Sequence, residues 1–170
     1  LKENSLLHAG KKYNYALLKA DQFERAERQS SAAYLRSKRT IFPALHLRLL
    51  KKYSKKIKVW IVDGELVRDH FFLDFTEGGH HYRYPFVPPS EVWIDDDLSL
   101  RERRYVLLHE LHERNLMAER LHKTRTWKNH PLPFTIYCWA HRKASELEHF
   151  CRLHPQQLEK KINEELRKST

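Results

Sequence analysis

The pattern of apolar and polar positions changes twice along the chain, and each change marks a different kind of structure. Residues 14–39 lack Gly and Pro and carry apolar side chains at helical spacings, which predicts a helix. Pro43 ends it, and a second helix is predicted at about 44–54. From Lys58 short apolar runs alternate with turn residues. They predict strands at 58–62, 70–76 and 91–95, an extended segment at 82–87, a hairpin turn at 63–64 and a further turn at 77–79.

A helical period returns after residue 96. Ser99 and Glu102 form a capping box, which predicts a helix from about 100 to about 122. Two more helices are predicted, at about 134–152 and 155–167. The order of helices, sheet and helices indicates an α+β fold.

The predicted elements divide the chain into two parts. We expect a helical N-terminal extension at 1–57 and one α+β domain at 58–170. Because the connections between the predicted strands are short, the sheet should be small and mostly antiparallel. It should pack on the helix at 100–122 and on a second C-terminal helix.

Composition narrows the class of protein. The 170 residues include 41% hydrophobic residues, enough for a core, and no apolar run approaches the ~18 residues of a membrane span, so we expect no membrane segment. Two cysteines without CxxC spacing exclude a thiolate zinc cluster and favour a reducing, cytoplasmic location. No signal peptide pattern is visible, and the start at Leu1 instead of Met leaves a preceding segment open.

Charge is concentrated at the N-terminal end. Residues 1–58 hold 15 Lys/Arg and 4 Asp/Glu, a net charge of +11, whereas residues 59–170 hold 17 and 18, a net charge of −1. Lysines and arginines interleaved with aromatic residues predict nucleic-acid contact through residues 11–58. No known nucleic-acid-binding motif is present, and a solvated basic face that aids solubility is the alternative.

The sequence His109-Glu110-Leu111-His112-Glu113 carries the candidate chemistry. It lies inside the apolar helix predicted at 100–122, where ionised carboxylates cost several kcal/mol unless they are paired or bind a metal. At ~100° per residue, His109 and Glu113 lie one turn apart on one face. The pattern differs by one residue from His-Glu-x-x-His, the zinc helix of many metallopeptidases, and predicts a metal site.

The helix at 134–152 offers matching donors. His141 and Glu148 are two turns apart at the edge of its apolar stripe. If the two helices pack together, His109, Glu113, His141 and Glu148 can converge as metal ligands. This donor set suits zinc first, and also manganese or iron. Glu110 would then be the catalytic base.

Three other interpretations stay open. The histidines and glutamates could form structural ion pairs such as Glu110–Arg114. His112 points about 60° away from His109 and favours a packing role. His80 and His81, beside Gly78-Gly79, could reach a site on the sheet edge but favour a solvated turn. A ferritin-like carboxylate site is the third, because two segments fit Glu-x-x-His, Glu119 to His122 and Glu146 to His149.

Residues 91–117 resemble the strand, cap and active-site helix of small zincins, the minimal gluzincin-like domains of phage and stress-response regulators. The resemblance implies that His109 is the first metal ligand, that Glu110 is the catalytic residue, and that Glu148 or Glu146 stands for the third ligand. Glu113 replaces the family's second His. The chain also resembles prokaryotic and phage proteins with His-Glu-x-x-Glu followed by His, a resemblance that implies no function.

The sequence therefore predicts a metal-dependent hydrolase that is peptidase-like. The alternative is a nucleic-acid- or ribonucleoprotein-associated protein whose His/Glu cluster is structural or inactive.

Overall fold

The computed structural model describes residues 41–123 and 134–169. The chain divides into two compact units between Pro43 and Ala44, so residues 44–57 belong with the second unit. The helix predicted at 14–39 lies outside the described residues. The described elements of the second unit are β1 (His46–Leu49), β2 (Lys58–Val62), α4 (Gly64–His70), β3 (Gly78–His80), β4 (Glu91–Asp95), α5 (Glu102–Lys123), α6 (Phe134–Leu153), the short 3-10 helix η2 (Pro155–Gln157) and α7 (Leu158–Lys168).

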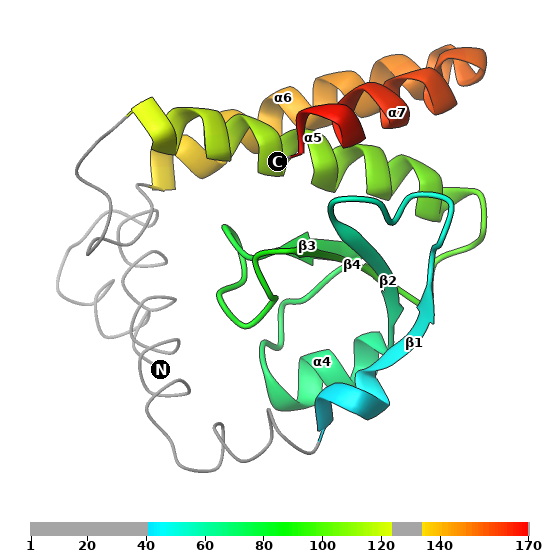
Figure 1. Cartoon of the computed structure of the whole chain (residues 1–170), viewed down its shortest axis with the longest axis vertical. Coiled ribbons are helices and arrows are strands. Elements are labelled where there is room, and N and C mark those ends of the chain that lie inside the picture. Colours follow the sequence, from blue (N-terminus) through cyan, green and yellow to red (C-terminus); the bar gives the residue numbers. More distant parts are fainter. Residues whose placement is uncertain (1–40, 124–133, 170) are drawn as a thin grey trace, which may run out of the picture. The chain divides into compact units, whose positions relative to one another are not determined.

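The predicted α+β class is confirmed. The strands form one mixed sheet in the order β1-β2-β4-β3. β1 pairs with β2 and β3 pairs with β4 in antiparallel fashion, whereas β2 and β4 are parallel. Figure 1 shows α5, α6 and α7 together on one side of this sheet and α4 on the other.

The parallel pairing explains why the predicted hairpin at Asp63-Gly64 is wrong. A chain that joins parallel strands must cross over instead of turning back. Asp63 instead caps α4, and its carboxylate accepts a hydrogen bond from the backbone N–H of Leu66 (2.9 Å). Glycine is required at position 64 because a Cβ there would clash with the carboxylate of Asp95.

The predicted strand at 70–76 is also wrong. Its aromatic side chains are buried without joining the sheet and contact other rings, with centroids 5.2 Å apart for Phe71–Phe86 and 5.4 Å apart for Phe75–Tyr84. The next strand along the chain is β3, which includes Gly78 and Gly79, where a turn was predicted. The segment 82–87, predicted to be extended, forms turns.

The helix predicted at 44–54 is replaced by β1 and a loop. The apolar spacing of Leu45, Leu49 and Leu50 is helical, but β2 offers its edge, and pairing with it satisfies the backbone of 46–49. Tertiary pairing therefore overrides the local pattern.

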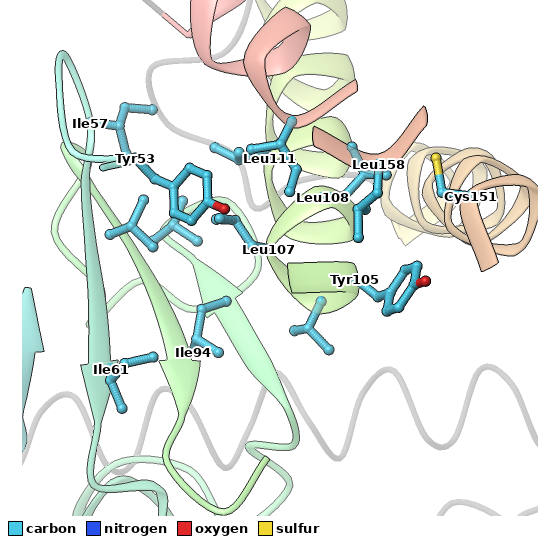
Figure 2. Close-up of a cluster of buried hydrophobic side chains, with 14 residues drawn as sticks. Tyr53, Ile57, Ile61, Ile94, Tyr105, Leu107, Leu108, Leu111, Cys151 and Leu158 are labelled. Carbon is cyan, nitrogen blue, oxygen red and sulfur yellow. The ribbon is translucent and has the colours of Figure 1, made fainter. Parts of the chain in front are cut away.

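The main core lies between the sheet and α5. Alternate residues of β2 and β4, including Ile61 and Ile94, face Leu107, Leu108 and Leu111 of α5 (Figure 2). α5 begins at Glu102, and Ser99 caps it as predicted, because the Ser99 hydroxyl accepts a hydrogen bond from the N–H of Glu102 (3.2 Å). Among the described residues, no helix is both long and apolar enough to cross a bilayer.

Candidate metal centre

Two packed helices bring the predicted donors together. His109 and Glu113 lie one turn apart on the buried side of α5, and α6 packs along α5 with His141 facing them. His109 and Glu113 are buried, whereas the side chain of His141 is 49% exposed. The expected convergence of these three side chains is present.

Three atoms of these residues form a compact group, which we call the donor triangle. His109 Nε2 lies 3.0 Å from His141 Nδ1, and Glu113 Oε2 lies 2.9 Å from His141 Nδ1 and 3.5 Å from His109 Nε2. Ligands about 2.0–2.2 Å from a tetrahedral metal are roughly 3.3–3.6 Å apart. The spacing therefore fits three ligands of one metal ion.

Hydrogen bonds and a metal ion are alternatives inside the donor triangle. Oε2 of Glu113 can accept from both imidazole nitrogens, but His109 Nε2 is 3.5 Å away, beyond the usual 2.7–3.2 Å of an N–H···O hydrogen bond. A cation near the centre would replace the protons and contact all three atoms at once.

Glu148 does not join the triangle. Its Oε2 lies 2.9 Å from Nδ1 of His109, the ring nitrogen that faces away from the triangle. Its other oxygen accepts a hydrogen bond from Arg152, which also binds Glu102. The sequence predicted Glu148 as a ligand, but its place is that of a carboxylate that orients a ligating histidine.

Glu110 lines the same cavity as the donor triangle. The cavity has a volume of about 240 Å³, and Arg83, Tyr137 and Ser145 also line it. Burial, together with the nearby charge of Glu113, raises the pKa of Glu110 to about 8. The alternative pair Glu110–Arg114 is not formed in the described part of the chain, because Arg114 donates instead to the carbonyl of Pro89 (3.2 Å).

His80 lies at the site, although the sequence favoured a solvated turn for it over a place at the sheet edge. It is fully buried on β3, and its Nε2 lies 3.1 Å from Oε1 of Glu113 and 3.9 Å from Glu110. The interpretation of His80 as part of a solvated turn is therefore wrong. The sequence feature that pointed to this arrangement was the pair Gly78-Gly79, because the absence of side chains there lets β3 pack closely against the residues around it.

The electrostatics couple these residues tightly. Burial would lower the pKa of His109, but its hydrogen bonds to Glu113 and Glu148 outweigh this and raise the pKa to about 10. Burial would raise the pKa of Glu113, yet hydrogen bonds from His109, His141 and His80 hold it far below the usual range. Burial keeps the pKa of His80 below its ordinary value. Glu113 is thus held ionised, as a metal ligand must be, whereas a metal ion would have to displace the proton on Nε2 of His109.

The remaining candidates lie elsewhere. His112 faces α7, where its Nδ1 is 3.0 Å from Oε1 of Glu165, which fits the packing role expected of it. Glu146 is exposed and pairs with Lys143. The side chain of His122 lies outside the described residues. The ferritin-like interpretation finds no four-helix bundle in residues 41–123 and 134–169, where α5 packs on a sheet.

Comparisons with protein-family models, with curated proteins and with solved structures found no match for this chain. The case for a function therefore rests on the geometry of the site.

Proposed function

We propose that this protein is a metal-dependent hydrolase of peptidase-like type. His109, Glu113 and His141 would hold zinc, with manganese or iron as alternatives, and Glu110 would be the catalytic base. The observation that carries the proposal is the donor triangle, whose three atoms lie 2.9–3.5 Å apart. Two histidines and one glutamate are also the ligand set of known catalytic zinc sites with an open fourth position.

The residues divide the chemistry between them. A bound divalent metal supplies a Lewis acid that polarises a carbonyl and lowers the pKa of water. The carboxylate of Glu110, which lines the cavity beside the triangle, accepts the proton of the attacking water and returns it to the leaving group. Glu148 holds the ring of His109 so that Nε2 faces the other corners of the donor triangle, where it would bind the metal. The resemblance of residues 91–117 to small zincins supports the same assignment of His109 and Glu110.

Glu110→Gln tests the proposal because it keeps the size of the side chain and removes the base. Protein purified without a His-tag is analysed for metal and assayed with fluorogenic peptides and esters. We expect Glu110→Gln to keep its metal and melting temperature and to lose about 10²–10⁴-fold in turnover. A wild-type protein that holds no metal, and that zinc, manganese and iron do not stabilise, rules the proposal out.

A nucleic-acid partner is a second proposal, supported by one observation. Lys51, Lys55, Lys56 and Lys58 are all exposed in and beside the loop that joins β1 to β2. Lys52 is excluded from this set because it binds Glu159 (2.7 Å). Affinity for RNA or DNA should fall steeply with salt and weaken on charge reversal of Lys51, Lys55 and Lys56. Binding that ignores salt would contradict it.

We also propose a cytoplasmic location. Cys138 and Cys151 are both free, one exposed and one buried, which fits a reducing compartment. Loss of function on targeting the protein to an oxidising compartment would support this, and equal function there would contradict it.

A further inference from the structure

The two oxygens of Glu113 have different partners. Oε2 is a corner of the donor triangle, 2.9 Å from His141 Nδ1. Oε1 faces the opposite way and lies 3.1 Å from Nε2 of His80, whose ring is fully buried. A carboxylate can bind a metal through one oxygen or through both, so the partner of Oε1 decides which mode Glu113 adopts.

The other nitrogen of His80 identifies where its proton lies. Nδ1 is buried and has no hydrogen-bond partner in the described part of the chain. A neutral imidazole carries one N–H, and a buried N–H without an acceptor costs about 1–3 kcal/mol. The proton therefore belongs on Nε2, which donates it to Oε1 of Glu113. His80 acting as a metal ligand through Nε2 would move the proton to Nδ1, where nothing accepts it.

We propose that His80 is a positioning residue that keeps Glu113 bound to the metal through one oxygen only. The inference rests on the metal centre proposed above. A hydrogen bond donated by His80 occupies Oε1 and holds it off the metal, so Oε2 alone is the ligand. The fourth position then stays open toward the cavity that Glu110 lines.

The structure of β3 places His80 beside Oε1 of Glu113. Gly78 and His80 point to the same face of β3 because side chains alternate along a strand. A Cβ at Gly78 would lie 2.8 Å from the carbonyl oxygen of Trp93 and 3.2 Å from Cγ of Glu110. Glycine at this position therefore lets β3 pair closely with β4 and lie against α5, at the place from which His80 contacts Glu113.

Cobalt replaces zinc in the test because its visible spectrum reports coordination number. Affinity, stoichiometry and spectrum are measured for wild type, His80→Ala, His80→Gln and the control His81→Ala. The amide of Gln places an N–H donor near the position of Nε2, so His80→Gln should behave like wild type. We expect one metal per chain, an affinity about 10–100-fold lower in His80→Ala, and a spectrum shifted there toward five-coordination. His81→Ala should match wild type.

Each other result overturns the inference in its own way. Unchanged affinity and spectrum in His80→Ala would refute the role of His80 and leave the metal centre standing. Two metals per chain, with one lost in His80→Ala, would make His80 a ligand of a second cation beside Glu110 and Glu113. A wild type without metal would refute the proposed function and this inference together. If His80→Ala fails to fold, weak metal binding by folded His80→Gln would still contradict the role.

Discussion

Two His/Glu groups on α5 look alike in sequence and differ in what they can do. His109 belongs to the donor triangle, and His112, three residues later, belongs to the α7 cluster, which consists of His112, Asn115, Glu165 and Lys168. Glu165 is buried, yet Asn115 donates to its Oε2 (2.9 Å) and Lys168 to its Oε1 (2.7 Å). His112 lies 3.0 Å away, close but poorly aligned for a hydrogen bond.

The difference is the kind of atom that meets the carboxylate. In the α7 cluster the hydrogen-bond partners of Glu165 are an amide N–H and an ammonium group, which do not bind metal ions. In the donor triangle two imidazole nitrogens and a carboxylate oxygen lie within 3.5 Å of one another, and all three are common metal ligands. The side chains in contact therefore separate the two groups, which their spacing on α5 does not.

The largest expected effect comes from exchanging histidine for alanine in each group. His109→Ala should abolish stoichiometric metal binding, because it removes one corner of the triangle. His112→Ala, three residues away on the same helix, should leave the metal content unchanged. Metal analysis after exhaustive dialysis measures both. Equal loss of metal in the two variants would contradict the view that only the donor triangle, and not the α7 cluster, binds a metal.

Glu165→Gln should break the α7 cluster and leave the triangle intact. It removes the charge that Lys168 and His112 contact in a buried place, which should cost about 2–3 kcal/mol of unfolding free energy. Urea denaturation measures the loss, and metal content serves as the second readout. Glu164→Gln is the matched control, because Glu164 forms a solvent-screened ion pair with Lys161 three residues earlier, and its loss should leave the stability nearly unchanged.

Glu148→Gln should weaken metal binding without abolishing it. Gln can still contact Nδ1 of His109 but no longer carries the charge that raises the basicity of the ring. We expect an affinity about 10–100-fold lower, or roughly 1.4–2.7 kcal/mol. Glu146→Gln, one of the two residues matched to the zincin third ligand, should bind metal normally because Glu146 is exposed and pairs with Lys143. The reverse order of affinities would make Glu146 the functional residue.

The acid limb of stability gives the most specific signal, because it isolates the titration of one carboxylate. Burial would raise the pKa of Glu165, but His112, Lys168 and Asn115 outweigh it and lower the pKa to about 2, below the ordinary value of 4.5. Its contribution is therefore present above pH ~4.5 and is lost as the pH falls toward ~2. Between these values the wild type should lose up to about 1.4 kcal/mol per pH unit more than Glu165→Gln. Parallel acid curves for the two proteins would contradict the lowered pKa.

The sequence predicted the long elements well and the short ones poorly. α5, α6 and α7 carry a sustained helical period, and β2 and β4 are β-branched runs bounded by turns, so local signals sufficed. β1 and α4 depended on a partner that no local pattern reveals. The crossover from β2 to parallel β4 makes Asp63 a helix cap instead of a hairpin residue, and the free edge of β2 turns 46–49 into a strand.

The candidate metal centre shows the same dependence on tertiary pairing. His109, Glu113 and His141 could be predicted because each lies at a regular position on a long helix. For His80 a site on the sheet edge was only the less favoured interpretation, because His80 reaches Glu113 through the pairing of a three-residue strand with β4. Glu148 was placed on the correct face of α6, but spacing does not tell which nitrogen of His109 it contacts.

The unequal burial of the three corners has a consequence for the rates of metal exchange. The side chains of Glu113 and His109 are 3% and 10% exposed, whereas that of His141 is 49% exposed. In the proposed metal site, His141 is therefore the corner that an exchanging ion would reach most easily. We expect the rates of metal loading and exchange to depend on His141, while the strength of retention depends on Glu113 and His109.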